Sequence, residues 1–154
     1  MTRLIVGSTA PNFTLPDQAG RPVSLRDFAG QRVVLYCYPA DDTPGCTTEA
    51  CQFNDELASF KKLHVTVLGL SPDDAGSHAA FRKKYGLDFT LLSDLDKKVM
   101  TKYGAYGEKM LYGKKVIGVI RSTFVIGPTG KLEHVWYGPR TNGHAARVLA
   151  TLAD

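Results

Sequence analysis

The chain has 154 residues, 44% of them hydrophobic and 22% charged, as is typical of a globular protein with one core, so we expect a single domain over residues 1–154. Its 19 basic and 15 acidic residues give a net charge of +4, but the basic residues are scattered in short pairs rather than gathered on one face, and we therefore expect no nucleic-acid partner. No apolar run approaches the roughly 20 residues of a membrane helix, and the N-terminus lacks the apolar core of a signal peptide, so the sequence favours a cytoplasmic protein without a membrane partner.

The predicted elements begin with a short β-hairpin around residues 13–15 and 22–25, with Gly20 in its turn. Strands and helices then alternate, in this order: strand 33–38, a helix from residue 44, strand 65–70, a helix ending at residue 85, a helix over residues 95–103, a hairpin of strands 123–126 and 132–137, and a helix over residues 145–152. This alternation predicts an α/β fold in which helices flank a central mixed sheet.

Glycines mark the predicted ends of two helices, at Gly86 and Gly104. The second of these helices is predicted to bury one face, formed by Leu95, Val99, Met100 and Tyr103. The predicted cap of the last helix is Thr141 or Asn142. The segment 107–115 is predicted to be a loop.

The helix from residue 44 begins with a signal that places a cysteine in its first turn. Thr43 is a good N-cap, and Pro44 suits the first helical position, where no N–H is needed. Five residues at helical spacing then form an apolar stripe: Cys46, Ala50, Phe53, Leu57 and Phe60. Cys46 therefore lies near free N–H groups and the positive helix end, which favour a thiolate. The alternative is that Cys46 is only a small apolar residue at the top of the stripe.

The second cysteine of this helix, Cys51, lies off the apolar stripe, so core packing explains it poorly. On ideal helix geometry its Cα would be about 8.7 Å from that of Cys46. A disulfide rarely spans more than about 7 Å between Cα atoms, so the intact helix keeps the two sulfurs apart. We predict that oxidation unwinds the first turns of the helix and joins Cys46 to Cys51, the alternative being that Cys51 is an unreactive, half-exposed thiol.

The remaining polar and sulfur-containing residues near these elements have simpler interpretations. Cys37 lies within an apolar strand and is predicted to be buried and inert. Asp41 and Asp42 precede the helix and suit turn and capping roles. The histidines show no metal-ligand spacing, so we expect each of them at the surface or at the end of a helix or strand, and we expect neither a metal nor a cofactor. They are His64, His78, His134 and His144.

The Cys-x4-Cys spacing is not the Cys-x2-Cys of a dithiol exchanger. Because the second cysteine is withheld until the helix opens, the order suits a thiolate that is oxidised by a peroxide to a sulfenic acid and then condenses with a resolving thiol. Such a reaction needs donors for the oxygen on which charge develops, and the N–H groups near Gly45 and Cys46 are candidates.

The motif Pro39-Ala-Asp-Asp-Thr43-Pro-Gly-Cys46 resembles the active-site signature of the peroxiredoxins, Pro-x3-Thr/Ser-x2-Cys. The spacing of Cys46 and Cys51 and the short chain further resemble the bacterioferritin comigratory protein, or peroxiredoxin Q, branch. The N-terminal segment 7–17, the pair Ser93-Asp94 and the segment 121–126 lie where that branch would have them.

This resemblance implies a thioredoxin-like fold with an N-terminal β-hairpin. It also implies roles for six residues: Cys46 as the peroxidatic cysteine, Cys51 as the resolving cysteine, Pro39 as a shield of the site, Thr43 in orienting the peroxide, Arg121 as a cation, and Glu49 in holding that arginine. Judged from sequence alone, Arg121 is a strand residue that is as well explained as a surface arginine.

The function implied is that of a thiol peroxidase that reduces hydrogen peroxide and organic hydroperoxides. Its Cys46–Cys51 disulfide would be reduced by thioredoxin or a similar dithiol protein, and the chain would be a monomer or a weak homodimer. The alternatives are a thioredoxin-like thiol–disulfide exchange protein, disfavoured by the absence of Cys-x2-Cys, and a non-catalytic binding module, disfavoured by the presence of Thr43, Cys46 and Arg121 together.

Overall fold

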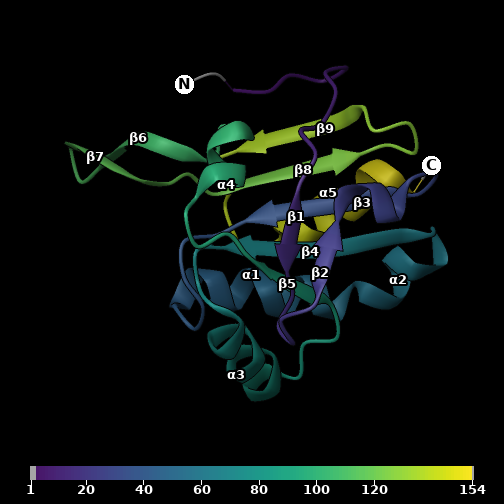
Figure 1. Cartoon of the computed structure of the whole chain (residues 1–154), viewed down its shortest axis with the longest axis horizontal. Coiled ribbons are helices and arrows are strands. Elements are labelled where there is room, and N and C mark those ends of the chain that lie inside the picture. Colours follow the sequence, from purple (N-terminus) through teal and green to yellow (C-terminus); the bar gives the residue numbers. More distant parts are fainter. Residues whose placement is uncertain (1–2, 154) are drawn as a thin grey trace.

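The computed structural model describes residues 3–153 and has a five-stranded sheet at its centre (Figure 1). The strands are β3 (Arg32–Cys37), β4 (Val65–Ser71), β5 (Thr90–Ser93), β8 (Ser122–Ile126) and β9 (Leu132–Tyr137). Their spatial order is β5-β4-β3-β8-β9. β3 is parallel to β4 and β4 to β5, whereas β8 is antiparallel to both β3 and β9. The sheet is therefore mixed, as predicted.

Two small hairpins accompany the sheet. The N-terminal one pairs β1 (Thr14–Pro16) with β2 (Pro22–Ser24), and Gly20 in its turn has a positive φ of 78°, which confirms the prediction. A short 3-10 helix, η1 (Leu25–Phe28), follows β2. The second hairpin pairs β6 (Tyr106–Leu111) with β7 (Lys114–Val119) and projects from the side of the molecule (Figure 1).

Successive residues of β3 enter two separate hydrophobic clusters, because side chains alternate between the faces of a strand. Leu35 and Cys37 belong to one cluster, and Val34 and Tyr36 to the other. The helices are α1 (Pro44–Asp55), α2 (Leu57–Lys62), α3 (Ala75–Tyr85), α4 (Lys98–Lys102) and α5 (His144–Leu152). Side chains of α1, α2, α3 and α5 all enter the second cluster, so these helices cover the sheet face to which Tyr36 points.

The predicted stripe of α1 is confirmed, since all five of its residues are buried in the second cluster. The helix is interrupted at Glu56, however, which separates α1 from α2 without turning the stripe away from the sheet. The cap predicted for α5 is wrong. Its N-cap is Gly143, in a left-handed conformation, while the side chain of Asn142 accepts a hydrogen bond from Gln52 on α1.

The predicted helix over residues 95–103 is shorter than expected. The carboxylate of Asp94 accepts hydrogen bonds from the N–H groups of Val99 and Met100, so α4 begins only at Lys98. Leu95 consequently lies outside the helix and is 61% exposed, although the other three residues of the predicted face are buried.

The loop predicted over residues 107–115 is also wrong, because this segment is the hairpin of β6 and β7. Its two-residue turn, Tyr112-Gly113, has a positive φ at both positions, as hairpins with two-residue turns favour. Met110 and Ile117 on its strands are exposed, so the hairpin lacks the buried apolar face that makes a strand recognisable in a sequence.

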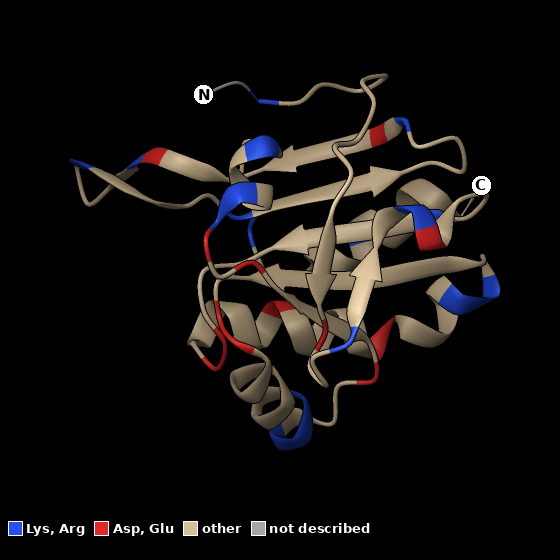
Figure 2. Ribbon diagram, in the orientation of Figure 1, with Lys and Arg blue, Asp and Glu red and all other residues tan. Residues whose placement is uncertain are grey.

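The basic pairs of the sequence lie at exposed ends of separate elements, as expected of solvated surface (Figure 2). Lys61 and Lys62 end α2, and Lys83 and Lys84 lie in the last turn of α3. Over residues 3–153, no helix is both long enough and apolar enough to cross a lipid bilayer.

Candidate active site

Cys46 lies in the first turn of α1 and is 1% exposed. Thr43 occupies the N-cap in an extended conformation, and Pro44 follows at the first helical position, as predicted. The first intrahelical bond runs from the N–H of Thr47 to the carbonyl of Thr43, over 2.8 Å, which leaves the N–H groups of Gly45 and Cys46 without intrahelical partners. These groups and the positive end of the helix favour a negative charge on the Cys46 sulfur.

The hydroxyl of Thr43 does not cap the helix, contrary to the prediction. It donates a hydrogen bond to the carbonyl of Ala40, 3.0 Å away, and so closes the loop that precedes α1. Pro39 lies half-buried in the same loop, just after β3. The motif residues Pro39, Thr43 and Cys46 thus come from one continuous segment at the end of β3.

Arg121 reaches this segment from a distant part of the chain. It directly precedes β8, and because Ser122 pairs with Cys37, the start of β8 lies beside the end of β3. The Nη2 atom of Arg121 is 3.4 Å from the Cys46 sulfur. A Cβ atom added to Gly45 would also lie 3.4 Å from Nη2, so the guanidinium rests against the first turn of α1. A fixed cation therefore contacts the sulfur.

Glu49 lies one turn after Cys46 and is fully buried. Its Oε1 atom accepts a 2.6 Å hydrogen bond from Nη1 of Arg121, whereas its Oε2 atom has no hydrogen-bond partner among residues 3–153. Burial raises the pKa of Glu49 to about 7, and the attraction of Arg121 offsets this only in part. Burial lowers the pKa of Arg121, but Glu49 and Cys46 together more than compensate and raise it, so the guanidinium remains a cation.

Cys51 is half-buried on α1, and both it and Cys46 are free thiols. Burial and the nearby carboxylate of Asp55 raise the pKa of the Cys51 thiol. With α1 intact between them, the two cysteines are held apart by the helix, as the spacing predicts.

Cys37 is fully buried in β3, as predicted. Burial raises the pKa of its thiol far above the ordinary value, and the charges of Asp94 and Glu49 add to this effect. Because the thiolate is the reactive form, Cys37 is inert in the folded protein.

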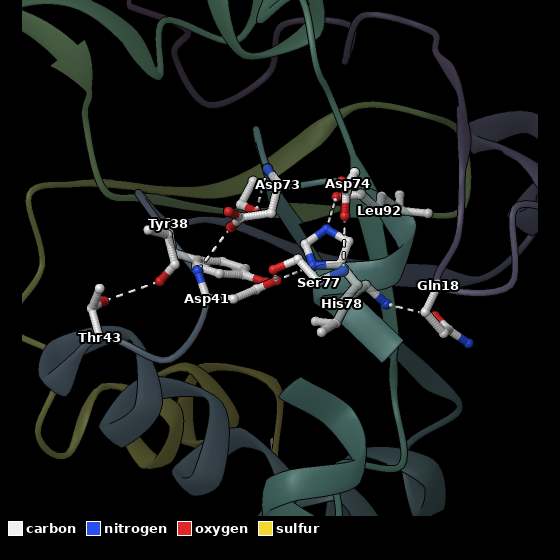
Figure 3. Close-up of polar contacts among 12 residues, drawn as sticks. Gln18, Tyr38, Asp41, Thr43, Asp73, Asp74, Ser77, His78 and Leu92 are labelled. Carbon is white, nitrogen blue, oxygen red and sulfur yellow. Dashed lines mark hydrogen bonds and ion pairs between the residues drawn. The ribbon is translucent and has the colours of Figure 1, made fainter. Parts of the chain in front are cut away.

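Asp41 and His78 form a buried pair that the sequence does not predict (Figure 3). Asp41 lies at a turn, as predicted, but its side chain is directed to His78. His78 Nδ1 lies 2.7 Å from Asp41 Oδ2, which links the loop before α1 to α3. The predicted position at the surface or at the end of a helix or strand is wrong for His78, which lies within α3 and is fully buried. Its spacing of three residues from the buried Phe81 was the available signal of burial.

The predictions for His144 and Asp42 are each correct only in part. His144 is buried but does begin a helix, α5, and burial together with Arg147 and Arg121 lowers its pKa to about 4. Asp42 is at a turn, with a left-handed φ of 58°, as expected, but it does not cap α1.

Comparisons with known proteins agree with this geometry. Residues 6–135 match the AhpC/TSA family. The sequence is 51% identical to that of a putative peroxiredoxin of Mycobacterium tuberculosis over 152 residues, which are 99% of this chain and 97% of its relative. The fold matches a cysteine-to-serine variant of PrxQ from Xylella fastidiosa with a TM-score of 0.92 and 38% identity, over 99% of this chain and 98% of that one.

A second solved structure is that of the bacterioferritin comigratory protein of Xanthomonas campestris, which has been studied for its alkyl peroxide reduction activity. It matches with a TM-score of 0.87 and 40% identity, over 92% of this chain and 90% of that one. These matches confirm the predicted thioredoxin-like fold and the resemblance seen in the sequence. The chain therefore belongs to the AhpC/TSA family and, within it, to the peroxiredoxins, which are thiol peroxidases.

Proposed function

We propose that Cys46 is the peroxidatic cysteine of this peroxiredoxin and that Cys51 is its resolving cysteine. The observation that most supports the first role is the contact of 3.4 Å between Arg121 Nη2 and the Cys46 sulfur. Because a thiolate is the nucleophile, a cysteine at a helix N-terminus beside a fixed cation is suited to attack a peroxide.

In the first step, the Cys46 thiolate attacks the terminal oxygen of hydrogen peroxide or an organic hydroperoxide. An S–O bond forms, the O–O bond breaks, and the leaving hydroxide or alkoxide takes a proton to become water or an alcohol. Arg121 and the free N–H groups of Gly45 and Cys46 stabilise the charge that develops on the oxygens. The Thr43 hydroxyl orients the peroxide, Pro39 shields the sulfur from solvent, and Glu49 holds Arg121 in place.

In the second step, the first turns of α1 unwind and the Cys51 sulfur attacks the Cys46 sulfenic acid. An S–S bond forms, the S–O bond breaks, and the hydroxide leaves as water after it takes a proton. A dithiol protein such as thioredoxin then returns two electrons and two protons by thiol–disulfide exchange. We further propose that the protein acts in the cytoplasm, as a single domain and as a monomer or weak homodimer.

The proposal is tested by peroxide consumption with thioredoxin, its reductase and NADPH. Replacing the nucleophile, in Cys46→Ser, is expected to abolish turnover, whereas Cys37→Ala, which alters an inert buried thiol, should retain it. Cys51→Ser should keep the first oxidation, seen as one sulfenic acid per chain, but lose turnover with thioredoxin. Peroxide consumption by Cys46→Ser at the wild-type rate would overturn the proposal, and insulin reduction without peroxide consumption would favour a thiol–disulfide exchange protein.

A further inference from the structure

The loop between β3 and α1 is held by a buried carboxylate. Both oxygens of Asp41 are used, since Oδ1 accepts from the Tyr38 hydroxyl at 2.5 Å, and Oδ2 lies 2.7 Å from both Ser77 Oγ and His78 Nδ1 (Figure 3). The side chains of Asp41 and His78 are 4% and 0% exposed. Asp41 stands two residues before Thr43, so these contacts lie next to the proposed peroxide site.

Both ring nitrogens of His78 lie against hydrogen-bonding partners. Its second ring nitrogen, Nε2, lies 2.9 Å from the carbonyl oxygen of Leu92, on the opposite side of the ring from Asp41. A carbonyl and a carboxylate only accept hydrogen bonds, and a neutral imidazole has a single N–H to donate. Burial alone would raise the pKa of Asp41, but the hydrogen bonds from His78 and Tyr38 outweigh it and hold that pKa below its ordinary value. Asp41 and His78 therefore form a close, buried and fully hydrogen-bonded pair.

The main chain of Asp41 is held as well. Its N–H donates to Oδ2 of Asp73, 2.8 Å away, and the same oxygen accepts a hydrogen bond from the Ser71 hydroxyl at 2.7 Å. Asp73 and His78 lie on the segment from β4 to α3, so one short stretch of chain fixes both the backbone and the side chain of Asp41. The loop around Asp41 is also closed by the hydrogen bond that the Thr43 hydroxyl donates to the carbonyl oxygen of Ala40.

We propose that the Asp41–His78 pair is a positioning device that sets where Thr43 stands relative to the Cys46 sulfur and the bound peroxide. This inference rests on the proposed role of Cys46. A buried polar or ionic pair contributes little net stability compared with apolar side chains of the same volume, but its directional contacts fix the segments that it joins. Because reacting atoms must meet in a narrow range of geometry, a shift of the loop slows the reaction even in a fully folded chain.

The neighbouring residue Asp42 provides a matched control. It is in the same loop and has the same side chain, but it is 42% exposed, and its partners are the Lys84 ammonium and the Tyr85 hydroxyl at the surface. Asparagine tolerates the left-handed conformation of this position, so Asp42→Asn removes the charge without backbone strain.

The test compares two reactions of Cys46 in reduced protein. One is oxidation by hydrogen peroxide in a single turnover, and the other is alkylation by iodoacetamide, followed on the peptide that contains Cys46. Asp41→Asn and His78→Asn are expected to slow the peroxide reaction by about 10- to 100-fold, the effect of a small misplacement of reacting groups. Alkylation, which needs the thiolate but neither Thr43 nor a bound peroxide, should proceed at the wild-type rate.

Further variants make the result decisive. Asp42→Asn should react with peroxide as the wild type does, and the double variant Asp41→Asn/His78→Asn should be no slower than the slower single variant, because the pair acts as one unit. If Asp41→Asn fails to fold, Tyr38→Phe can replace it, because it removes one hydrogen bond to Asp41 with little change of volume. This variant should show a smaller fall of the peroxide rate, again with an unchanged alkylation rate.

Two outcomes would overturn the positioning role. They are an unchanged peroxide rate in a folded Asp41→Asn or Tyr38→Phe variant, and a parallel fall of the peroxide and alkylation rates. A failure of the proposed function of Cys46 would be recognised separately, because wild type and Cys46→Ser would then consume peroxide at the same rate.

Discussion

Arg121 contacts both Cys46 and Glu49, and the charge of the buried Glu49 responds to pH near neutrality. Burial raises its folded-state pKa to about 7 from an ordinary value of 4.5, despite the attraction of Arg121. The folded chain thus retains a proton on Glu49 at pH values where the unfolded chain has released it. The contribution to stability is fully present below about pH 4.5 and is lost as the pH rises through 7.

Glu49→Gln should remove this pH dependence, because glutamine does not titrate. The free energy of unfolding of the wild type, relative to that of Glu49→Gln, is expected to fall between pH 4.5 and pH 8 by about 2 to 3 kcal/mol, at about 1.4 kcal/mol per unit of pKa difference. Urea unfolding of both proteins at several pH values measures the difference in their free energies of unfolding. The contributions of the titrating groups that both proteins share cancel in this difference. Glu108→Gln, which alters a 65% exposed carboxylate on β6, should follow the wild type. A difference between wild type and Glu49→Gln that does not vary with pH would contradict the prediction.

At the scale of the element, α1 is held to the rest of the molecule by two similar side-chain contacts. Gln52 donates to the side chain of Asn142 at 2.8 Å and accepts from the N–H of Gly143 at 2.7 Å. Asn54 makes the same pair of bonds, to the carbonyl of Gly86 and from the N–H of Asp88. Gln52 directly follows the proposed resolving cysteine, so its contacts oppose the opening of α1 that disulfide formation requires.

Gln52→Ala should therefore speed formation of the Cys46–Cys51 disulfide after oxidation. Loss of its two hydrogen bonds is expected to destabilise the docked, closed state of α1 by about 1 to 3 kcal/mol. If the transition state for opening is unaffected, α1 opens about 5- to 150-fold faster. The measurement is rapid acid quenching after one equivalent of peroxide, followed by mass mapping of the disulfide.

Asn54→Ala is the control for that experiment. It removes a comparable pair of hydrogen bonds and should lower the free energy of unfolding to a similar extent. Because Asn54 lies beyond the segment that must unwind, its loss should leave the rate of disulfide formation unchanged. Equal acceleration in both variants would mean that general stability, and not the contact of Gln52, controls the opening of α1.

At the scale of the whole molecule, the sheet separates two hydrophobic clusters, and only the second contains Cys46. Phe124 on β8 belongs to the first and is fully buried, with its ring against those of Tyr103 and Tyr137 at centroid distances of 5.1 and 5.6 Å. Both clusters contribute to the stability of the fold, but the first lies on the sheet face away from Cys46.

Phe124→Ala should consequently lower the free energy of unfolding by about 3 to 5 kcal/mol, the usual cost of a large cavity in a core. Chemical denaturation of the reduced protein measures this loss. Ile117→Ala, which shortens a 70% exposed side chain on β7, should change stability by less than about 0.5 kcal/mol. A loss below 1 kcal/mol in Phe124→Ala would show that the first cluster repacks around the missing ring.

Predictions from sequence were correct where the information is local. The start of α1 follows from Thr43 and Pro44, whose backbone preferences act within one turn, and the stripe from Cys46 to Phe60 follows from helical periodicity. The buried strands β3, β4 and β8 were found to within a residue or two because each is a continuous apolar run. The burial of Cys37 follows from its place in such a run.

Predictions failed where burial or pairing depends on distant residues. Leu95 is a separate case, because the hydrogen bonds that delay the start of α4 to Lys98 are local, from the N–H groups of Val99 and Met100 to Asp94, but apolar periodicity does not reveal them. The β6–β7 hairpin was missed because both of its faces have exposed side chains, so it lacks strand periodicity. The pairing of Asp41 with His78 joins residues 37 positions apart, and neither has a local signal that names the other.

The sequence by itself determined that a cysteine lies in the first turn of a helix and that strands and helices alternate around it. It also determined that a second cysteine follows at a spacing at which an intact helix holds the two sulfurs apart. Only the tertiary structure decided which groups meet the first cysteine. Sheet pairing brings Arg121 from the start of β8 to the end of β3, and packing of α3 brings His78 to Asp41. The physical reason is that helix starts and strand runs depend on neighbours along the chain, whereas contacts between charged groups depend on how whole elements pack.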